Sequence, residues 1–180
     1  MRAIVIPDTE LFDESTMEFR QVKSTVLRLE HSLVSLSKWE AKWKVPFLTK
    51  DRKTVEQTID YIRCMTINQK SVNPDTYRAL TNEHINMVNE YISTDQTATT
   101  FNDANNPVSR EIITSEVIYF WMSQYNIPME CQKWHLSRLL TLLRIAGIKN
   151  SPEKKMPRNA IYSRNRALNA ARRKAHRTKG

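Results

Sequence analysis

Glycine is almost missing from this sequence, with only 2 Gly among 180 residues. Glycine-rich loops bind phosphates through backbone that carries no side chains, so the P-loop and dinucleotide-binding motifs are absent. Cysteine is equally scarce, and both Cys64 and Cys131 fall in apolar helical patterns, which favours reduced core thiols over a disulfide framework. No run of 18 apolar residues occurs and no apolar leader follows the start, so we expect neither a membrane span nor a signal peptide.

Acidic residues are nearly absent from the C-terminal end. The formal net charge of the chain is +9. From Lys149 to Gly180, however, 11 Lys and Arg residues stand against Glu153 alone, a net charge of +10 that leaves −1 for residues 1–148. The sequence therefore predicts a nearly neutral domain over residues 1–150 and a basic tail over residues 151–180.

The tail has few side chains from which to build a core. Its larger apolar residues are Met156, Ile161, Tyr162 and Leu168. Residues 166–175 have high helix propensity but no apolar stripe broad enough to pack, so we expect a disordered or partly helical tail. Three roles stay open: binding nucleic acid through its phosphates, docking to an acidic protein partner, and solvation alone.

Short β-branched segments predict a small β element near the N-terminus. Residues 2–6 read Arg-Ala-Ile-Val-Ile and precede Pro7-Asp8, which is typical of an edge strand followed by a turn. Residues 18–30 continue the pattern, and apolar and polar residues alternate from Thr25 to Glu30. A β-hairpin or a two- to three-stranded sheet is expected here.

Helical spacing begins at Ser32. Apolar residues recur every three or four positions up to Trp43, with His31 or Ser32 as the cap and Pro46 as the stop. Two further helices are expected over residues 51–67, beginning at Asp51 or Thr54, and from Thr81 to Ile92. The polar, Asn-rich segment 95–108 predicts an exposed loop. The predicted fold class is mainly α: a compact helical domain with a small N-terminal β element.

Residues 109–149 predict a helical hairpin around which the domain is organised. Ser109 is expected to cap its first helix, Pro128 to stop that helix, and Gly147 to end the second. The two apolar stripes predicted for these helices comprise Ile113, Val117, Phe120, Trp121 and Gln124, and Leu136, Leu139, Leu140 and Leu143. We expect this hairpin to be the most buried part of the chain.

No catalytic constellation is apparent in the sequence. Cys131 and His135 lie four residues apart, but a zinc site needs a second pair, and Cys64 has no histidine near it in sequence. Glu30-His31-Ser32 places an acid, an imidazole and a hydroxyl in a row, yet adjacent strand residues point to opposite faces, so helix capping is favoured. We expect no enzymatic activity, no metal and no cofactor.

Aromatic and basic residues are the candidates for partner binding. Trp39 and Trp43 lie four apart with lysines around them, a pattern that fits either a stacking surface or core anchors edged by lysine stems. Their helical setting favours the core. The candidate partner-binding residues are Trp39, Trp43, Trp121, Trp134, Tyr162, Arg166, Leu168, Arg172 and Arg173.

Several phrases of the sequence resemble a known family. They are LRLEHSLVSLSKWEAKW (27–43), SREIITSEVIYFW (109–121), PMECQKWHLSRLLTLLR (128–144) and ALNAARR (167–173). Together they resemble the tail assembly chaperones of long-tailed bacteriophages. The resemblance implies a protein that binds the long helical tape-measure protein in the host cytoplasm and keeps it soluble until tail-tube subunits replace it. Other tail proteins and further copies of the chain are possible partners.

Two other functional classes fit the same sequence. One is a virion structural or connector protein whose basic arm touches packaged DNA or a neighbouring subunit. The other is a nucleic-acid-binding regulator. Mass spectrometry of purified particles separates the first from a chaperone, because a connector is stoichiometric there and a chaperone is absent.

Overall fold

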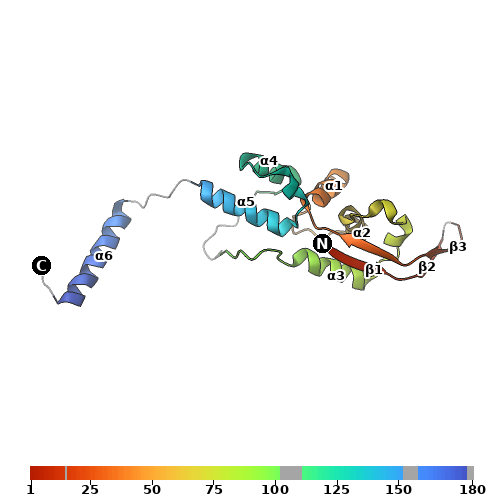
Figure 1. Ribbon diagram of the computed structural model, residues 1–180, viewed down its shortest axis with the longest axis horizontal. Helices are drawn as coiled ribbons and strands as arrows, with labels where there is room; N and C mark the ends of the chain where they lie inside the picture. The colour runs from red at the N-terminus through yellow and green to blue at the C-terminus, as the bar shows by residue number, and fades with distance from the viewer. Residues whose placement is uncertain (15, 102–110, 152–157, 178–180) are drawn as a thin grey trace. The chain divides into compact units, whose positions relative to one another are not determined.

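The computed structural model describes residues 1–14, 16–101, 111–151 and 158–177. Two compact units divide the chain, Met1–Gly147 and Ile148–Gly180. The described residues are mainly helical, with two short antiparallel strand pairs at the N-terminal end (Figure 1). This confirms the predicted fold class of a mainly α protein with a small β element.

The strand pairs form a bent two-stranded ribbon. β1 (Arg2–Ile6) pairs with β4 (Thr25–Leu29), and β2 (Thr9–Asp13) pairs with β3 (Glu18–Val22). The ribbon bends between the two pairs, where the backbone N–H of Ser24 donates to Asp8 Oδ1 at 2.6 Å. β1 lies where the sequence predicts it, whereas β2 was not predicted, because adjacent Leu11 and Phe12 obscure the alternation.

The helices follow the ribbon along the chain. They are α1 (Leu33–Trp43), α2 (Val55–Met65), α3 (Asn82–Ser93), α4 (Ser115–Gln124), α5 (Leu136–Asn150) and α6 (Arg158–His176), with 3₁₀ helices η1 (Gln69–Ser71), η2 (Pro74–Tyr77) and η3 (Met129–Lys133). The first three α-helices begin at capping boxes in which Ser32, Thr54 and Thr81 accept from the N–H three residues on. These starts confirm the caps expected from the sequence.

α1 is the element around which the first unit is organised. Its Leu33 and Leu36 pack in one hydrophobic cluster with residues of α4, η3 and α5. Its Trp39 packs in a second cluster with residues of the ribbon, α2 and α3. Figure 1 shows α1 between α4 and α2 accordingly. The expectation that residues 109–149 form the organising centre is therefore wrong, because two cores share one helix.

The start and the face of α4 differ from the prediction. The helix begins at Ser115, and residues 111–114 before it are not helical; Ser109 lies outside the described residues. Its buried face carries Ser115, Ile118 and Met122, while the predicted stripe residue Phe120 is 59% exposed. Several sets of apolar positions in α4 have helical spacing, so the sequence did not determine which set is buried. Packing against α1 decides which face of α4 is buried.

α5 runs past the residue that was expected to end it. Gly147 lies inside the helix, and a side chain added there would come within 3.2 Å of Tyr125 Oη. The glycine therefore serves close packing, and the prediction of a helix end at Gly147 is wrong. Leu136, Leu139 and Leu143 are buried as expected, whereas Leu140 is only partly buried.

Candidate functional site

The described residues contain no cluster of metal ligands. No group of three or more His, Cys, Asp or Glu in this part of the chain is placed to hold a metal ion. Both cysteines are free, and burial raises the pKa of the Cys64 thiol, so the reactive thiolate is disfavoured at neutral pH. Within the same described ranges, no helix combines the length and apolarity needed to cross a membrane.

Two buried histidines join the starts of α1 and α5. His31 Nδ1 lies 2.6 Å from Tyr61 Oη, and the His31 and His135 ring centroids are 5.1 Å apart. Burial, helped by the proximity of His135, lowers the pKa of His31 to about 3, and burial also lowers the pKa of His135. Both imidazoles are therefore neutral at physiological pH.

Several polar groups beside this pair have structural partners, whereas the buried His135 Nε2 has no hydrogen-bond partner among the described residues. Tyr91 Oη donates to Glu30 Oε1 at 2.7 Å, and the Met1 amino group lies 2.9 Å from Glu30 Oε2. The backbone N–H of Leu136 donates to the carbonyl of His31 at 2.7 Å. Glu30 is thus held in an ion pair, the ring of His31 is buried, and Ser32 caps α1. Each residue of the row Glu30-His31-Ser32 therefore has a structural role.

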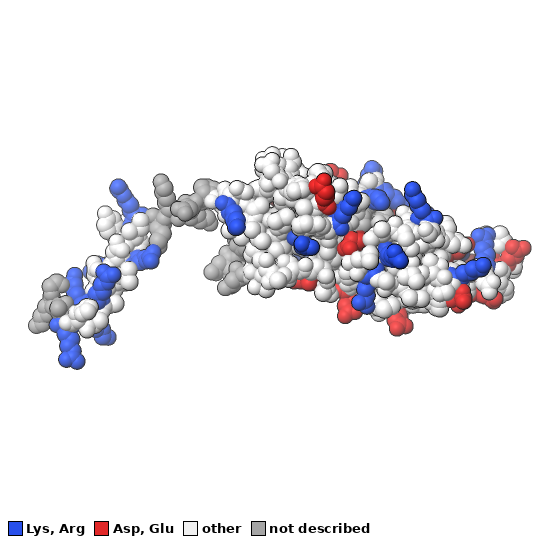
Figure 2. All heavy atoms as spheres, viewed as in Figure 1, with Lys and Arg blue, Asp and Glu red and all other residues white. Residues whose placement is uncertain are grey.

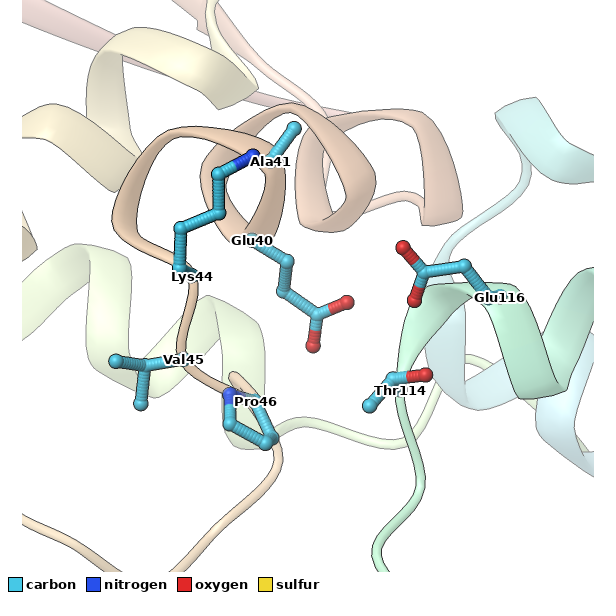
Figure 3. Close-up of a pocket in the computed structure, with 7 residues that line it drawn as sticks. All are labelled: Glu40, Ala41, Lys44, Val45, Pro46, Thr114 and Glu116. Atoms are coloured by element: carbon cyan, nitrogen blue, oxygen red, sulfur yellow. The ribbon is translucent and has the colours of Figure 1, made fainter.

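A cavity of about 280 Å³ lies between the end of α1 and the start of α4 (Figure 3). It contains two carboxylates, those of Glu40 and Glu116. Glu40 is buried, and its oxygens accept from the backbone N–H groups of Phe47 at 2.8 Å and of Ser115 at 2.7 Å. Because these amides occupy Glu40, the cavity is a structural junction in which α1 caps the first turn of α4.

A larger groove of about 580 Å³ is built from the start of α1 and the chain after α2. Apolar side chains of Val34, Met65 and Ile67 line it, and Ile67 is 61% exposed. Lys38, Lys70 and Lys133 also line the groove and are exposed. An apolar floor with a cationic rim suits an apolar side chain from a segment that also carries acidic residues.

Backbone hydrogen bonds fix one wall of this groove. The N–H of Ile67 donates to the carbonyl of Arg28 at 2.8 Å. The side chain of Asn68 accepts from the N–H of Arg28 at 3.0 Å and donates to the carbonyl of Val26 at 2.9 Å. The chain after α2 is therefore held along β4 like a short extra strand, so the groove is formed before any partner arrives.

The structure does not bring the four tryptophans together into one surface. Trp39 is 1% exposed, and its indole N–H donates to the carbonyl of Gln57 at 2.9 Å. Trp43 donates to Asp60 Oδ2 at 3.0 Å. Trp121 and Trp134 belong to the other cluster and are half-buried, as packing partners of the core. Trp39 is a core anchor and has almost no surface to offer a partner.

The remaining candidate residues all lie on α6. They are Tyr162, Arg166, Leu168, Arg172 and Arg173, and no residue of this helix is buried. The helix carries six Lys and Arg residues and no acidic residue, and Figure 2 shows its basic side chains. Tyr162 is 70% exposed and Leu168 is 47% exposed. α6 thus presents both charge and apolar area to solvent.

Sequence reasoning missed a second apolar surface on the β2–β3 end of the ribbon. Phe12 and Phe19 lie opposite each other, with ring centroids 5.1 Å apart, and are 44% and 71% exposed. The groove around Ile67 was also missed. Two phenylalanines placed symmetrically about a polar turn are a signal that could have revealed the aromatic pair.

No family model, no curated protein and no solved structure matches this chain.

Proposed function

We propose that this chain is a non-enzymatic tail assembly chaperone that binds the helical tape-measure protein of a long-tailed phage in the host cytoplasm. The preformed groove with its lysine rim is the observation that carries the proposal. Two of the segments that resemble the chaperone family contribute to the lining of this groove, through Glu30, Ser32, Val34, Ser35, Lys38 and Lys133. The resemblance and the groove thus overlap in part, while the residues from Cys64 to Ser71 that complete the groove lie outside those segments.

A groove of this kind suits a long amphipathic helix. Such a helix exposes apolar side chains at intervals of three and four residues, and these aggregate unless a partner covers them. Val34 and Ile67 offer apolar contact, while Lys38, Lys70 and Lys133 attract acidic side chains beside the apolar stripe. Binding through a few exposed contacts is reversible, as required of a chaperone that is later displaced.

Co-expression with the tape-measure protein of the same phage tests the proposal. We expect an otherwise insoluble tape-measure protein to co-purify with this chain, and Ile67→Asp in the groove to abolish the complex. Val55→Asp is the matched control, because Val55 is also an exposed aliphatic residue, at 69%, but does not line the groove. Failure of the two wild-type proteins to co-purify at low salt would refute the proposal.

Nucleic-acid binding is the second candidate function, and the charge of α6 favours it. Duplex DNA bound by such a helix should be released by salt, with a log–log slope of about −0.9 per phosphate neutralised. Titration of labelled duplex DNA with the wild-type chain and with the double variant Arg172→Glu, Arg173→Glu distinguishes the two functions. Tight, salt-sensitive binding that this variant loses would favour nucleic acid over the chaperone proposal.

A further inference from the structure

The β2–β3 end of the ribbon has two unlike faces. Asp13 and Val22 are buried on one face, where Asp13 Oδ2 lies 3.6 Å from an Nη of Arg78, a residue just after η2. Phe12 and Phe19 alternate with these positions and therefore point the other way, into solvent. We call the face that carries Phe12 and Phe19 the aromatic face of the ribbon.

The aromatic face also carries a glutamate. Glu10 precedes Phe12 by two residues, so it shares this face. Glu14 is exposed near the turn, whereas Glu18 pairs with Asp13 and lies on the other face. Counted over both faces, residues 9–22 contain four acidic residues and Arg20, a net charge of −3, and the buried Asp13 pairs with Arg20 and Arg78. Met17 in the turn is 74% exposed. Exposed paired aromatics edged by charge are typical of a protein-binding surface.

α6 has the complementary properties. Ile161, Leu168 and Arg172 are spaced by seven and four residues, which places them on one side of the helix. Arg172 lies about 6 Å along the helix from Leu168 at 1.5 Å per residue. Glu10 lies about 7 Å along the strand from Phe12 at 3.4 Å per residue. With Leu168 against the two phenylalanines, Arg172 therefore reaches Glu10, and Ile161 extends toward Met17.

We propose that α6 of one copy of this chain binds along the aromatic face of the β2–β3 ribbon of a second copy. The contact joins two different surfaces, so each added copy leaves one ribbon and one α6 open, and the copies assemble head to tail into a row or a closed ring. This inference is independent of the tape-measure proposal, because no residue of the aromatic face or of α6 lines the groove around Ile67.

Sedimentation velocity of the full chain, from low to high micromolar concentration, tests the assembly. We expect the wild-type protein to self-associate, and Phe19→Ser or Leu168→Ser each to raise the dissociation constant by about tenfold or more, the effect of losing an anchor residue. Both side chains are exposed, so neither change removes a core contact. Val55→Ser is the exposed control outside both surfaces and should leave association unchanged. A wild-type chain that stays monomeric throughout would overturn the proposal.

Charge exchange and cross-linking test the specific pairing. Glu10→Arg and Arg172→Glu should each weaken association, and the two changes in one chain should restore it.

In chains carrying Cys64→Ser and Cys131→Ala, one copy with Phe19→Cys and another with Leu168→Cys should form a mixed disulfide dimer on oxidation. With both new cysteines in one chain, a cross-link found only within monomers would show that α6 covers its own ribbon and would reject the second copy. Tape-measure binding by a strictly monomeric chain would leave the proposed function intact and reject this inference alone.

Discussion

α1 and α6 are both helices with charged and apolar residues, but they differ in what they bury. α1 buries five of its 11 residues, and α6 buries none of its 19. The capping box of α1 and its two clusters fix its ends and its faces. Most of the stability of protein helices comes from packing of an apolar face, which α6 lacks. α1 is therefore stabilised by the fold, whereas α6 has only its own helix propensity among the described residues.

The largest expected effect on stability comes from replacing a buried leucine of the first unit with alanine, compared with the same change at a leucine of α6. Leu139 is 0% exposed, so Leu139→Ala should lower the free energy of unfolding by about 2–5 kcal/mol. Leu168 in α6 is 47% exposed, so Leu168→Ala should change it by no more than about 0.5 kcal/mol. Urea unfolding followed by tryptophan fluorescence measures the stability of the first unit in both variants, because all four tryptophans lie there. Equal losses in the two variants would contradict the comparison.

The next effect is a pH dependence confined to the first unit. The folded pKa of His31 is about 3, below its ordinary value of 6.5. Well above pH 6.5 the ring is neutral in both states. As the pH falls from there toward 3, the unfolded chain binds a proton that the folded chain excludes, so stability declines by up to about 1.4 kcal/mol per pH unit. His135, whose pKa is also lowered, adds a decline of the same sign.

Unfolding measured in urea between pH 7 and pH 4.5 checks this dependence. His31→Gln should flatten the curve, although it also lowers stability at pH 7 by removing a buried contact with Tyr61. His176→Gln is the control, because His176 is exposed on α6. An unchanged slope in the His31 variant would mean that other groups cause the acid sensitivity.

A smaller effect separates the two carboxylates in the cavity between α1 and α4. Glu40→Gln replaces one of the two oxygens that accept backbone N–H groups with an amide donor, and should cost about 1–3 kcal/mol. Glu116 is exposed, so Glu116→Gln should cost less than about 1 kcal/mol. Thermal melts of both variants measure the difference. A Glu40 variant as stable as the wild type would show that the junction is dispensable.

The smallest effect concerns the glycine inside α5. Gly147→Ala gains helix propensity of up to about 1 kcal/mol, but its new methyl group lies 3.2 Å from Tyr125 Oη. The gain in helix propensity and the cost of the close contact nearly cancel, so we expect a change in the free energy of unfolding below about 1 kcal/mol. Adding Tyr125→Phe removes the close oxygen, and the double variant should be more stable than Gly147→Ala alone. A double variant of lower stability would show that the hydroxyl group is needed.

Local signals determined much of this protein. The starts of α1, α2 and α3 were predictable because each cap and its partner lie three residues apart in the chain. β1 was predictable from its β-branched run and the proline after it. The concentration of positive charge after Lys149 follows from composition alone. These features need only neighbouring residues to satisfy the backbone or to set the charge.

Only the tertiary structure decided the remaining features. α4 starts at Ser115 because Glu40, 75 residues earlier, accepts its backbone N–H, and no local pattern contains that partner. Gly147 is explained by Tyr125, and the two phenylalanines of the aromatic face meet only once the ribbon pairs. The order of residues determines which faces of an element can be apolar. Which of these faces is buried depends on the element packed against it, because any neighbour that removes apolar surface from water stabilises the contact.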